Sequence, residues 1–218
     1  MPIKTTSKKI VSTKVPKVVF LDRDGVINEF PGHGKYVTKL KEFQFIDGSL
    51  EAIRRLTEQG YQIFIVSNQA GVGKGWFTKN KLDHITRNMI SAVEKHGGRI
   101  KRAYYCVHRS NAGCDCRKPA IGNILKAYEL LKQPIKLAKD AFFIGDTEGD
   151  MKAGKNAGCK TIFVLSGMEN RRYLRYWTVK PDYVVKNLLE ATEIVLNGNG
   201  SSVKRSAISK NLTLYAYR

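Results

Sequence analysis

The feature that most constrains this chain is the stretch VVFLDRDGVIN at residues 18–28. Val18 to Leu21 are β-branched, aromatic or aliphatic and carry no charge, which is typical of a strand buried on both faces of a parallel sheet. Asp22 and Asp24 follow two positions apart, so their side chains point to one side while the strand geometry persists, and Gly25 lets the chain turn away. The stretch predicts two carboxylates at the carboxyl end of a buried strand, where open α/β sheets bind ligands.

Strands alternate with helices along the rest of the chain. Apolar runs predict further strands at about residues 61–68, 100–106, 141–146, 160–166 and 182–185. Helical spacing predicts helices at about residues 48–59, 78–97, 119–132 and 149–157. Residues 29–47 have no sustained period and indicate a small flap over the first strand. This order predicts an α/β fold, with a Rossmann-like, mostly parallel sheet, helices on both faces and a minimal cap.

Length and charge predict the domain organisation. With 218 residues, of which 42% are hydrophobic, we expect one core domain at 17–196 between basic extensions at 1–16 and 197–218. The net charge of +19 favours phosphorylated small molecules, nucleic acid or anionic surfaces as partners and does not choose among them. No apolar stretch approaches the roughly 20 residues that cross a bilayer. The amino terminus lacks the features of a secretory signal. We therefore expect a cytoplasmic monomer with no membrane contact.

Polar side chains stand at the ends of four predicted strands. In chain order, these ends carry Asp22 and Asp24, Ser67 and Asn68, Arg117 and Lys118, and Asp146 with Asp150 one helical turn later. Because the carboxyl ends of parallel strands lie on one edge of the sheet, we expect all of them in one crevice. Crowded carboxylates repel one another unless a cation lies among them. Oxygen ligands of this kind suit Mg²⁺, which keeps other positions for water and a phosphate oxygen.

This set of groups fits the hydrolysis of a phosphate monoester. Asp22 would attack phosphorus, since a carboxylate is an adequate nucleophile once metal and lysine neutralise the phosphoryl oxygens. Asp24 would protonate the leaving oxygen and then take a proton from the attacking water. The other groups would assist: Ser67 and Lys118 by holding the phosphoryl group, Asp146 by completing the Mg²⁺ site, and Asp150 by orienting the metal's water ligands or Lys118.

Three of the four cysteines lie close together beside a histidine. The pattern CxHx5CxC comprises Cys106, His108, Cys114 and Cys116, and it directly precedes Arg117. Three thiolates and one imidazole match a closed, tetrahedral, structural zinc site. The spacing differs from that of common zinc fingers, so on spacing alone isolated reduced cysteines stay an open alternative.

Four motifs together resemble those of the haloacid dehalogenase superfamily: DRDG at 22–25, Ser-Asn-Gln at 67–69, RKP at 117–119 and GDxxxD at 145–150. More narrowly, residues 17–190 are similar to the heptose bisphosphate and histidinol-phosphate phosphatases. The resemblance implies an Mg²⁺-dependent phosphomonoesterase with an aspartyl-phosphate intermediate. It assigns the nucleophile to Asp22, the acid/base to Asp24, phosphate binding to Ser67 and Lys118, and Mg²⁺ binding to Asp22, Asp146 and the Asp24 main-chain carbonyl. It also implies Zn²⁺ at Cys106, His108, Cys114 and Cys116, in a loop that fixes Arg117 and Lys118.

The resemblance also bears on the substrate. Residues 36–48 and GKGxF at 73–77 resemble the heptose 1,7-bisphosphate enzymes, whereas the short gap between His108 and Cys114 resembles the histidinol-phosphate enzymes. Thr147 stands where the heptose enzymes usually carry Lys or Arg. We expect the sugar bisphosphate as substrate and keep histidinol phosphate as the alternative. The residues expected to bind substrate or its phosphate are Ser67, Asn68, Arg117 and Lys118, with Lys74 as a further candidate.

Two readings from other classes stay open. The basic body and extensions also fit a phosphatase that acts on 3′-phosphorylated nucleic acid ends, which would bind less tightly as salt rises. The sequence contains no recognisable nucleic-acid-binding module, so this alternative is not favoured. The extensions also fit docking of the enzyme to a protein or anionic scaffold.

Overall fold

The computed structural model describes residues 15–197. Six parallel strands form one sheet in the order β3-β2-β1-β4-β5-β6. The strands are β1 (Val18–Leu21), β2 (Gln62–Asn68), β3 (Ile100–Cys106), β4 (Phe142–Gly145), β5 (Lys160–Val164) and β6 (Tyr183–Val185). Because β1 lies between β2 and β4, the predicted motifs at the ends of these three strands are neighbours in space.

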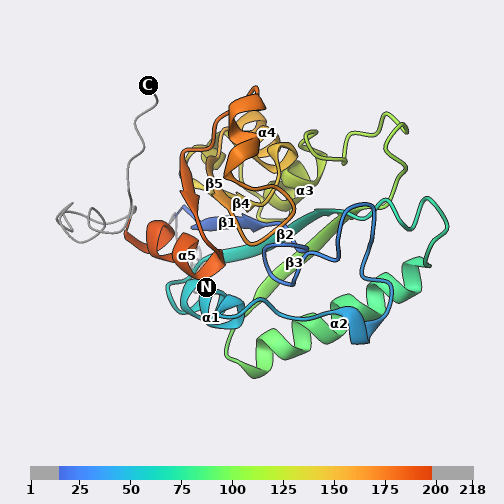
Figure 1. Ribbon diagram of the computed structural model, residues 1–218. Helices are drawn as coiled ribbons and strands as arrows, with labels where there is room; N and C mark the ends of the chain where they lie inside the picture. Colours follow the sequence, from blue (N-terminus) through green and yellow to red (C-terminus); the bar gives the residue numbers. More distant parts are fainter. Residues whose placement is uncertain (1–14, 198–218) are drawn as a thin grey trace, which may run out of the picture.

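Helices cover both faces of the sheet (Figure 1). On one face lie α1 (Ser49–Glu58), α2 (Lys79–Lys95) and α5 (Leu188–Asn197), and on the other lie α3 (Gly122–Leu130) and α4 (Glu148–Ala157). Strand residues divide between the two cores by alternation: Val19 and Leu21 pack towards α1 and α5, while Val18 and Phe20 pack towards α3 and α4. This two-sided burial explains why the central strands β1, β2, β4 and β5 contain continuous apolar runs, and the predicted fold class is confirmed.

Most predicted elements are confirmed within one to three residues at their ends. Thr78 caps the start of α2, since its hydroxyl accepts a hydrogen bond from the Lys81 N–H at 3.3 Å. One helix start was wrong: α3 begins at Gly122 and not at Pro119. The Pro119 region instead forms a turn, in which the Ala120 N–H donates to the Arg117 carbonyl and the Gly122 N–H to the Asp115 carbonyl.

Three short 3-10 helices and one α-helix were not predicted. The 3-10 helices are Leu40–Glu42, Ile135–Asp140 and Arg171–Tyr176. Leu40–Glu42 lies in the flap at 29–47, where Phe43 and Phe45 return to pack against the core. The α-helix α5 follows β6 and places Leu188, Ala191 and Val195 in the core.

The predicted extensions fall almost wholly outside the described residues, so the boundaries at 16 and 197 stay predictions; Asn197 itself ends α5. Within residues 15–197, no helix is both long enough and apolar enough to cross a membrane.

Candidate active site

Three carboxylates and one lysine meet at the carboxyl edge of the central strands. Asp22 follows β1, Asp146 follows β4, and Asp150 projects from the first turn of α4. One oxygen from each lies within 4.8 Å of the others. The Lys118 Nζ lies 2.8 Å from Asp22 Oδ1 and 2.5 Å from Asp150 Oδ1 and donates to the Val66 carbonyl at 2.8 Å. The structure thus brings together four predicted site residues from four separate segments.

The electrostatics of this cluster favour an additional cation. Burial raises the pKa of Asp22 above its ordinary value, although the Lys118 ammonium opposes the effect. Burial and the charges of Asp150 and Asp22 raise the pKa of Asp146 well above its ordinary value. Burial alone would lower the pKa of Lys118, but the carboxylates of Asp150 and Asp22 raise it above its ordinary value. One ammonium cannot balance three carboxylates, so a divalent cation would relieve the repulsion.

Local packing around Asp146 also fits a metal ion. Its Oδ2 accepts the Met168 N–H at 2.6 Å, while its Oδ1 is buried and has no hydrogen-bond donor within residues 15–197. Gly25 and Gly167 pack so tightly against Asp146 that a Cβ on either would overlap its carboxylate. Gly25 also has a φ of +84°, in the left-handed region that favours glycine. The buried, unpaired oxygen and the oxygen-only donor set fit Mg²⁺.

The helix cap of α4 orients Asp150. The Thr147 N–H and hydroxyl both donate to Asp150 Oδ2, at 3.0 and 2.6 Å. In return, the Thr147 hydroxyl accepts the Asp150 N–H, which completes a capping box. Thr147 therefore directs Asp150 towards Lys118.

A hydroxyl and an amide lie beside the carboxylates and Lys118. Ser67, the penultimate residue of β2, has a buried hydroxyl that accepts a hydrogen bond from Gln69 Nε2 at 3.3 Å and opposes the burial-induced rise in the pKa of Asp22. The Asn68 side chain accepts the Lys118 N–H at 3.1 Å and donates to the Lys118 carbonyl at 3.2 Å. The amide of Asn68 therefore holds the main chain of Lys118.

Asp24 lies apart from the three-carboxylate cluster, in a set of donors that the sequence did not reveal. Asn28 Nδ2 donates to Asp24 Oδ1 at 2.9 Å, and Gln69 Nε2 donates to Asp24 Oδ2 at 2.8 Å. Arg23 donates to both oxygens, with Nη2 at 2.9 Å from each. Gln69 belongs to the Ser-Asn-Gln motif and Arg23 to DRDG. The contact of Gln69 with Asp24 joins residues 45 positions apart, whereas Arg23 is the direct neighbour of Asp24 in the sequence. Arg23, Asn28 and Gln69 are thus the polar neighbours of Asp24 that sequence reasoning missed.

The predicted cysteine and histidine ligands converge after β3. The Cys114 sulfur lies 3.6 Å from those of Cys106 and Cys116, and His108 Nδ1 lies 3.8 Å from Cys106 Sγ and 3.3 Å from Cys116 Sγ. A tetrahedral zinc with Zn–S bonds of about 2.3 Å separates its thiolates by roughly 3.8 Å. The four side chains therefore have the donor types and the spacing of a structural zinc site.

The Cys/His loop supports a neighbouring turn. The carbonyl of Gly73 accepts a hydrogen bond from Arg109 Nε at 2.9 Å, and a Cβ on Gly73 would lie 2.5 Å from the Val107 carbonyl. The turn carries Lys74, whose Nζ lies 4.7 Å from the ring centroid of Trp76 and 5.7 Å from that of Tyr36. Lys74 is thus placed by the Cys/His loop and by two aromatic rings.

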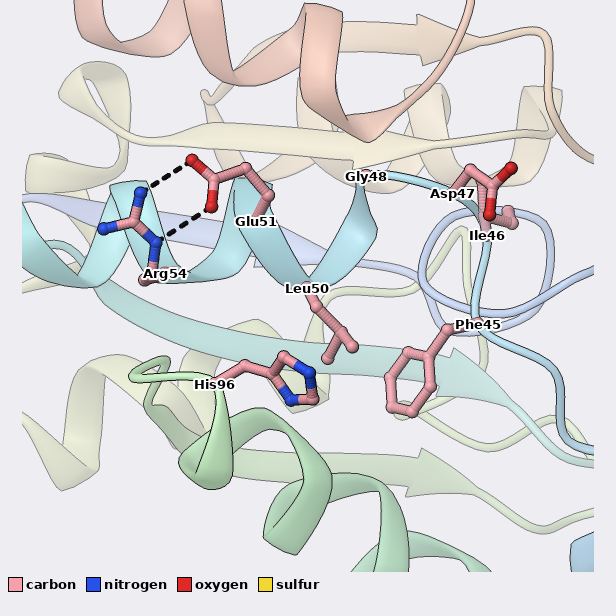
Figure 2. A pocket seen from close by; sticks show the side chains of 8 residues that line it. All are labelled: Phe45, Ile46, Asp47, Gly48, Leu50, Glu51, Arg54 and His96. Carbon is pink, nitrogen blue, oxygen red and sulfur yellow. Dashed lines mark hydrogen bonds and ion pairs between the residues drawn. The ribbon is translucent and has the colours of Figure 1, made fainter.

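A separate hollow of about 410 Å³ opens between α1 and the end of α2 (Figure 2). Figure 2 shows Phe45, Leu50 and His96 facing into it, with Arg54 paired to Glu51 on one side. None of its lining residues is a predicted site residue. The predicted site residues therefore lie outside this hollow.

Several known proteins are similar to this chain in sequence. The HAD-hydrolase-like family model matches residues 115–191. The D-glycero-beta-D-manno-heptose-1,7-bisphosphate 7-phosphatase of Pasteurella multocida is 39% identical, over 69% of this chain and 83% of its own length. The corresponding alpha-anomer enzyme of Campylobacter jejuni is 37% identical over the same shares.

A solved structure is similar in fold as well as in sequence. It is the D,D-heptose 1,7-bisphosphate phosphatase from B. bronchiseptica, complexed with magnesium and phosphate, with a TM-score of 0.75 and 30% identity. The match covers 84% of this chain and 99% of that one. The predicted resemblance is confirmed, and this chain belongs to the haloacid dehalogenase-like hydrolases, in the family of the heptose-1,7-bisphosphate 7-phosphatases.

Proposed function

We propose that this protein hydrolyses the 7-phosphate of D-glycero-D-manno-heptose 1,7-bisphosphate, giving the heptose 1-phosphate and inorganic phosphate. The observation that carries the proposal is the convergence of Asp22, Asp146 and Lys118 at one sheet edge, in a chain 39% identical to an enzyme named for this reaction. The net charge of +19 would attract a substrate that bears two phosphates.

Transfer to the enzyme is the first chemical step. An oxygen of Asp22 forms a bond to phosphorus as the bond from phosphorus to the sugar oxygen breaks, and Asp24 gives its proton to that oxygen. Ser67 and Lys118 hold the phosphoryl oxygens, and Asn68 supports Lys118 through its main chain. The sugar leaves as an alcohol, and Asp22 carries the phosphoryl group.

Hydrolysis of the aspartyl-phosphate is the second step. Asp24, now a carboxylate, takes a proton from a water molecule as the water oxygen attacks phosphorus. Phosphate leaves, Asp22 is a carboxylate again, and Asp24 holds the proton that the next sugar oxygen will receive. Asp24 therefore donates a proton in the first step and regains one from water in the second.

Mg²⁺ is the proposed cofactor of this site. Asp22, Asp146 and the Asp24 main-chain carbonyl would hold it, and Asp150 would orient its water ligands and Lys118. When bound, it would neutralise charge on the phosphoryl oxygens. The buried, unpaired Oδ1 of Asp146 supports this assignment.

Zn²⁺ is the proposed occupant of the Cys106, His108, Cys114 and Cys116 site. With four protein ligands the site would be closed, so its role would be structural. It would fix the loop that ends at Arg117 and Lys118 and that supports the Gly73 turn. We propose that Arg117 and Lys74 contact the part of the substrate beyond the reacting phosphate.

Phosphorus NMR of the reaction tests the proposal. In the presence of Mg²⁺, the signal of the 7-phosphate should disappear, that of the 1-phosphate should remain, and inorganic phosphate should appear. Loss of the 1-phosphate, or no change in either signal, would contradict the proposed function. Both anomers of the substrate should be compared, because the relatives from Pasteurella multocida and Campylobacter jejuni are named for different ones.

A further inference from the structure

The carboxylate of Asp24 is held from several directions by three neighbouring side chains. Arg23 donates from Nε and Nη2, Asn28 donates to Oδ1, and Gln69 donates to Oδ2. Arg23, Asn28 and Gln69 are each 0% exposed, whereas the Asp24 side chain keeps 15% of its surface exposed. The three buried residues therefore fix a carboxylate that itself remains accessible.

Arg23 is an unusual residue to bury. A fully buried cation costs several kcal/mol of hydration free energy, and the cost is offset only by a well-placed partner. Its ion pair within the described residues is with Asp24 at 2.9 Å, and its guanidinium carbon lies 5.8 Å from the ring centroid of Tyr105. The planar guanidinium group of Arg23 binds both oxygens of the Asp24 carboxylate and so sets its orientation, which a lysine cannot do.

Gln69 connects Asp24 to the phosphoryl position. Its Nε2 donates to Asp24 Oδ2 at 2.8 Å and to Ser67 Oγ at 3.3 Å. Its main-chain N–H donates to the Cys106 carbonyl at 2.7 Å, so its backbone is fixed at the end of β3. The buried amide of Gln69 therefore fixes the Asp24 carboxylate relative to the Ser67 hydroxyl.

We propose that Arg23 and Gln69 are positioning residues for proton transfer by Asp24. They do not touch substrate; they hold the Asp24 carboxyl group where it can reach the oxygen between phosphorus and sugar. The inference rests on the proposed function for the role of Asp24. The proposal predicts that loss of the Arg23 or Gln69 contact with Asp24 slows hydrolysis most for substrates whose leaving oxygen must be protonated.

The test compares two leaving groups. An alkyl phosphate such as the heptose 7-phosphate must be protonated as it leaves, whereas p-nitrophenyl phosphate releases a stable anion without a proton. The value of kcat/KM reports the steps up to the first irreversible one, which is transfer to Asp22. Steady-state rates for both substrates should be measured with Mg²⁺ for the full-length wild type, Arg23→Lys and Gln69→Met.

In both variants, kcat/KM for the heptose substrate should fall by about 10²-fold, the low end of a general-acid contribution. For p-nitrophenyl phosphate, it should change less than about threefold, because Asp24 contributes little to that step. The inhibition constant of inorganic phosphate should stay unchanged, since Ser67 and Lys118 are intact. Arg23→Met, measured in the same way, should lose more activity towards the heptose substrate than Arg23→Lys, because it loses the positive charge as well as the planar guanidinium group.

A buried hydrogen bond far from the site provides the matched control. Tyr61 is buried, and its hydroxyl donates to the Val195 carbonyl at 3.0 Å. Tyr61→Phe should lower stability without changing the ratio of the two kcat/KM values. If the Arg23 variants do not fold, Gln69→Met alone decides the question.

An equal loss with both substrates, or no loss with either, would overturn the positioning role. Failure of the proposed function gives a different result. In that case the wild type would not hydrolyse the heptose bisphosphate, and the same comparison would be made with the alkyl phosphate that it hydrolyses fastest.

Discussion

At the scale of single residues, the chemistry depends on where β1 ends. The four residues of β1 are all buried, and the next residue, Asp22, is 8% exposed beside Lys118 and Asp146. A carboxylate in such surroundings keeps few water molecules, and the lysine that pairs with it is also proposed to hold the phosphoryl group. Asp22 therefore has both the reach and the neighbours that a nucleophile needs.

Asp22→Asn should reduce kcat by about 10⁴-fold or more, because an amide cannot form the phosphorylated intermediate. The fold should persist, since the substitution keeps the side-chain shape and removes one of three crowded negative charges. Phosphate release and circular dichroism measure the two effects. Substantial hydrolysis by a folded variant would exclude Asp22 as the nucleophile.

Gly167→Ala should weaken metal binding, because its Cβ would displace the carboxylate of Asp146. We expect the Mg²⁺ concentration for half-maximal activity to rise by about 10-fold or more, as for the loss of other contacts that orient metal ligands. Gly149→Ala is the matched control, since its Cβ would meet only Thr147 Oγ1 at 3.6 Å. Equal Mg²⁺ dependence in the two variants would argue against Asp146 as a ligand.

At the scale of elements, the Cys/His loop joins β3 to the cations of the site. Removal of zinc by a chelator should raise KM for the bisphosphate, because Arg117 and the Gly73 turn lose their support. The fresh protein should contain about one zinc per chain, as four protein ligands bind one ion. Metal analysis that finds no zinc, or chelation that leaves KM unchanged, would contradict the structural role.

Asp182, which directly precedes β6, contacts two other elements, α4 and β5, through its side chain. Burial by itself would raise the pKa of Asp182, but hydrogen bonds from Lys155 and from the N–H and hydroxyl of Thr161 lower it below its ordinary value. A carboxyl group with a lowered pKa in the folded state stabilises the fold above its unfolded pKa of about 3.9. This stability is lost as the pH falls through the lowered, folded pKa.

Asp182→Asn should therefore lower the free energy of unfolding at pH 7 by up to about 1 kcal/mol, a small value because the pair is partly exposed. The difference from wild type should shrink as the pH falls below about 4. Urea unfolding at several pH values measures it. Asp83→Asn, which removes an exposed pair with Lys79, is the control. A difference that grows towards acid would refute the assignment.

The sequence predicted the elements better than it predicted their polar contacts. Uncharged runs such as Val18–Leu21 identify buried strands directly, and parallel order then brings their ends together. The start of α3 was misplaced because proline suits the first helical turn as well as the turn that Pro119 actually occupies. The contacts of Gln69 with Asp24 could not be predicted, because they join residues 45 positions apart through side-chain geometry.

At the scale of the whole molecule, charge and site have opposite signs. The chain carries a net charge of +19, yet its catalytic edge gathers three buried carboxylates around one lysine. The positive field would draw in a phosphorylated substrate, and the negative centre would hold the divalent cation. The same field would also attract a nucleic acid, so the net charge does not select between the substrates, and activity in solution must be compared directly.

The most direct test compares kcat/KM for heptose 1,7-bisphosphate, histidinol phosphate and a 3′-phosphorylated oligonucleotide under identical Mg²⁺ and salt conditions. The value for heptose 1,7-bisphosphate should exceed both others by at least about 10²-fold, as for an enzyme whose contacts discriminate between substrates. A higher value for histidinol phosphate or for the oligonucleotide would contradict the proposed function.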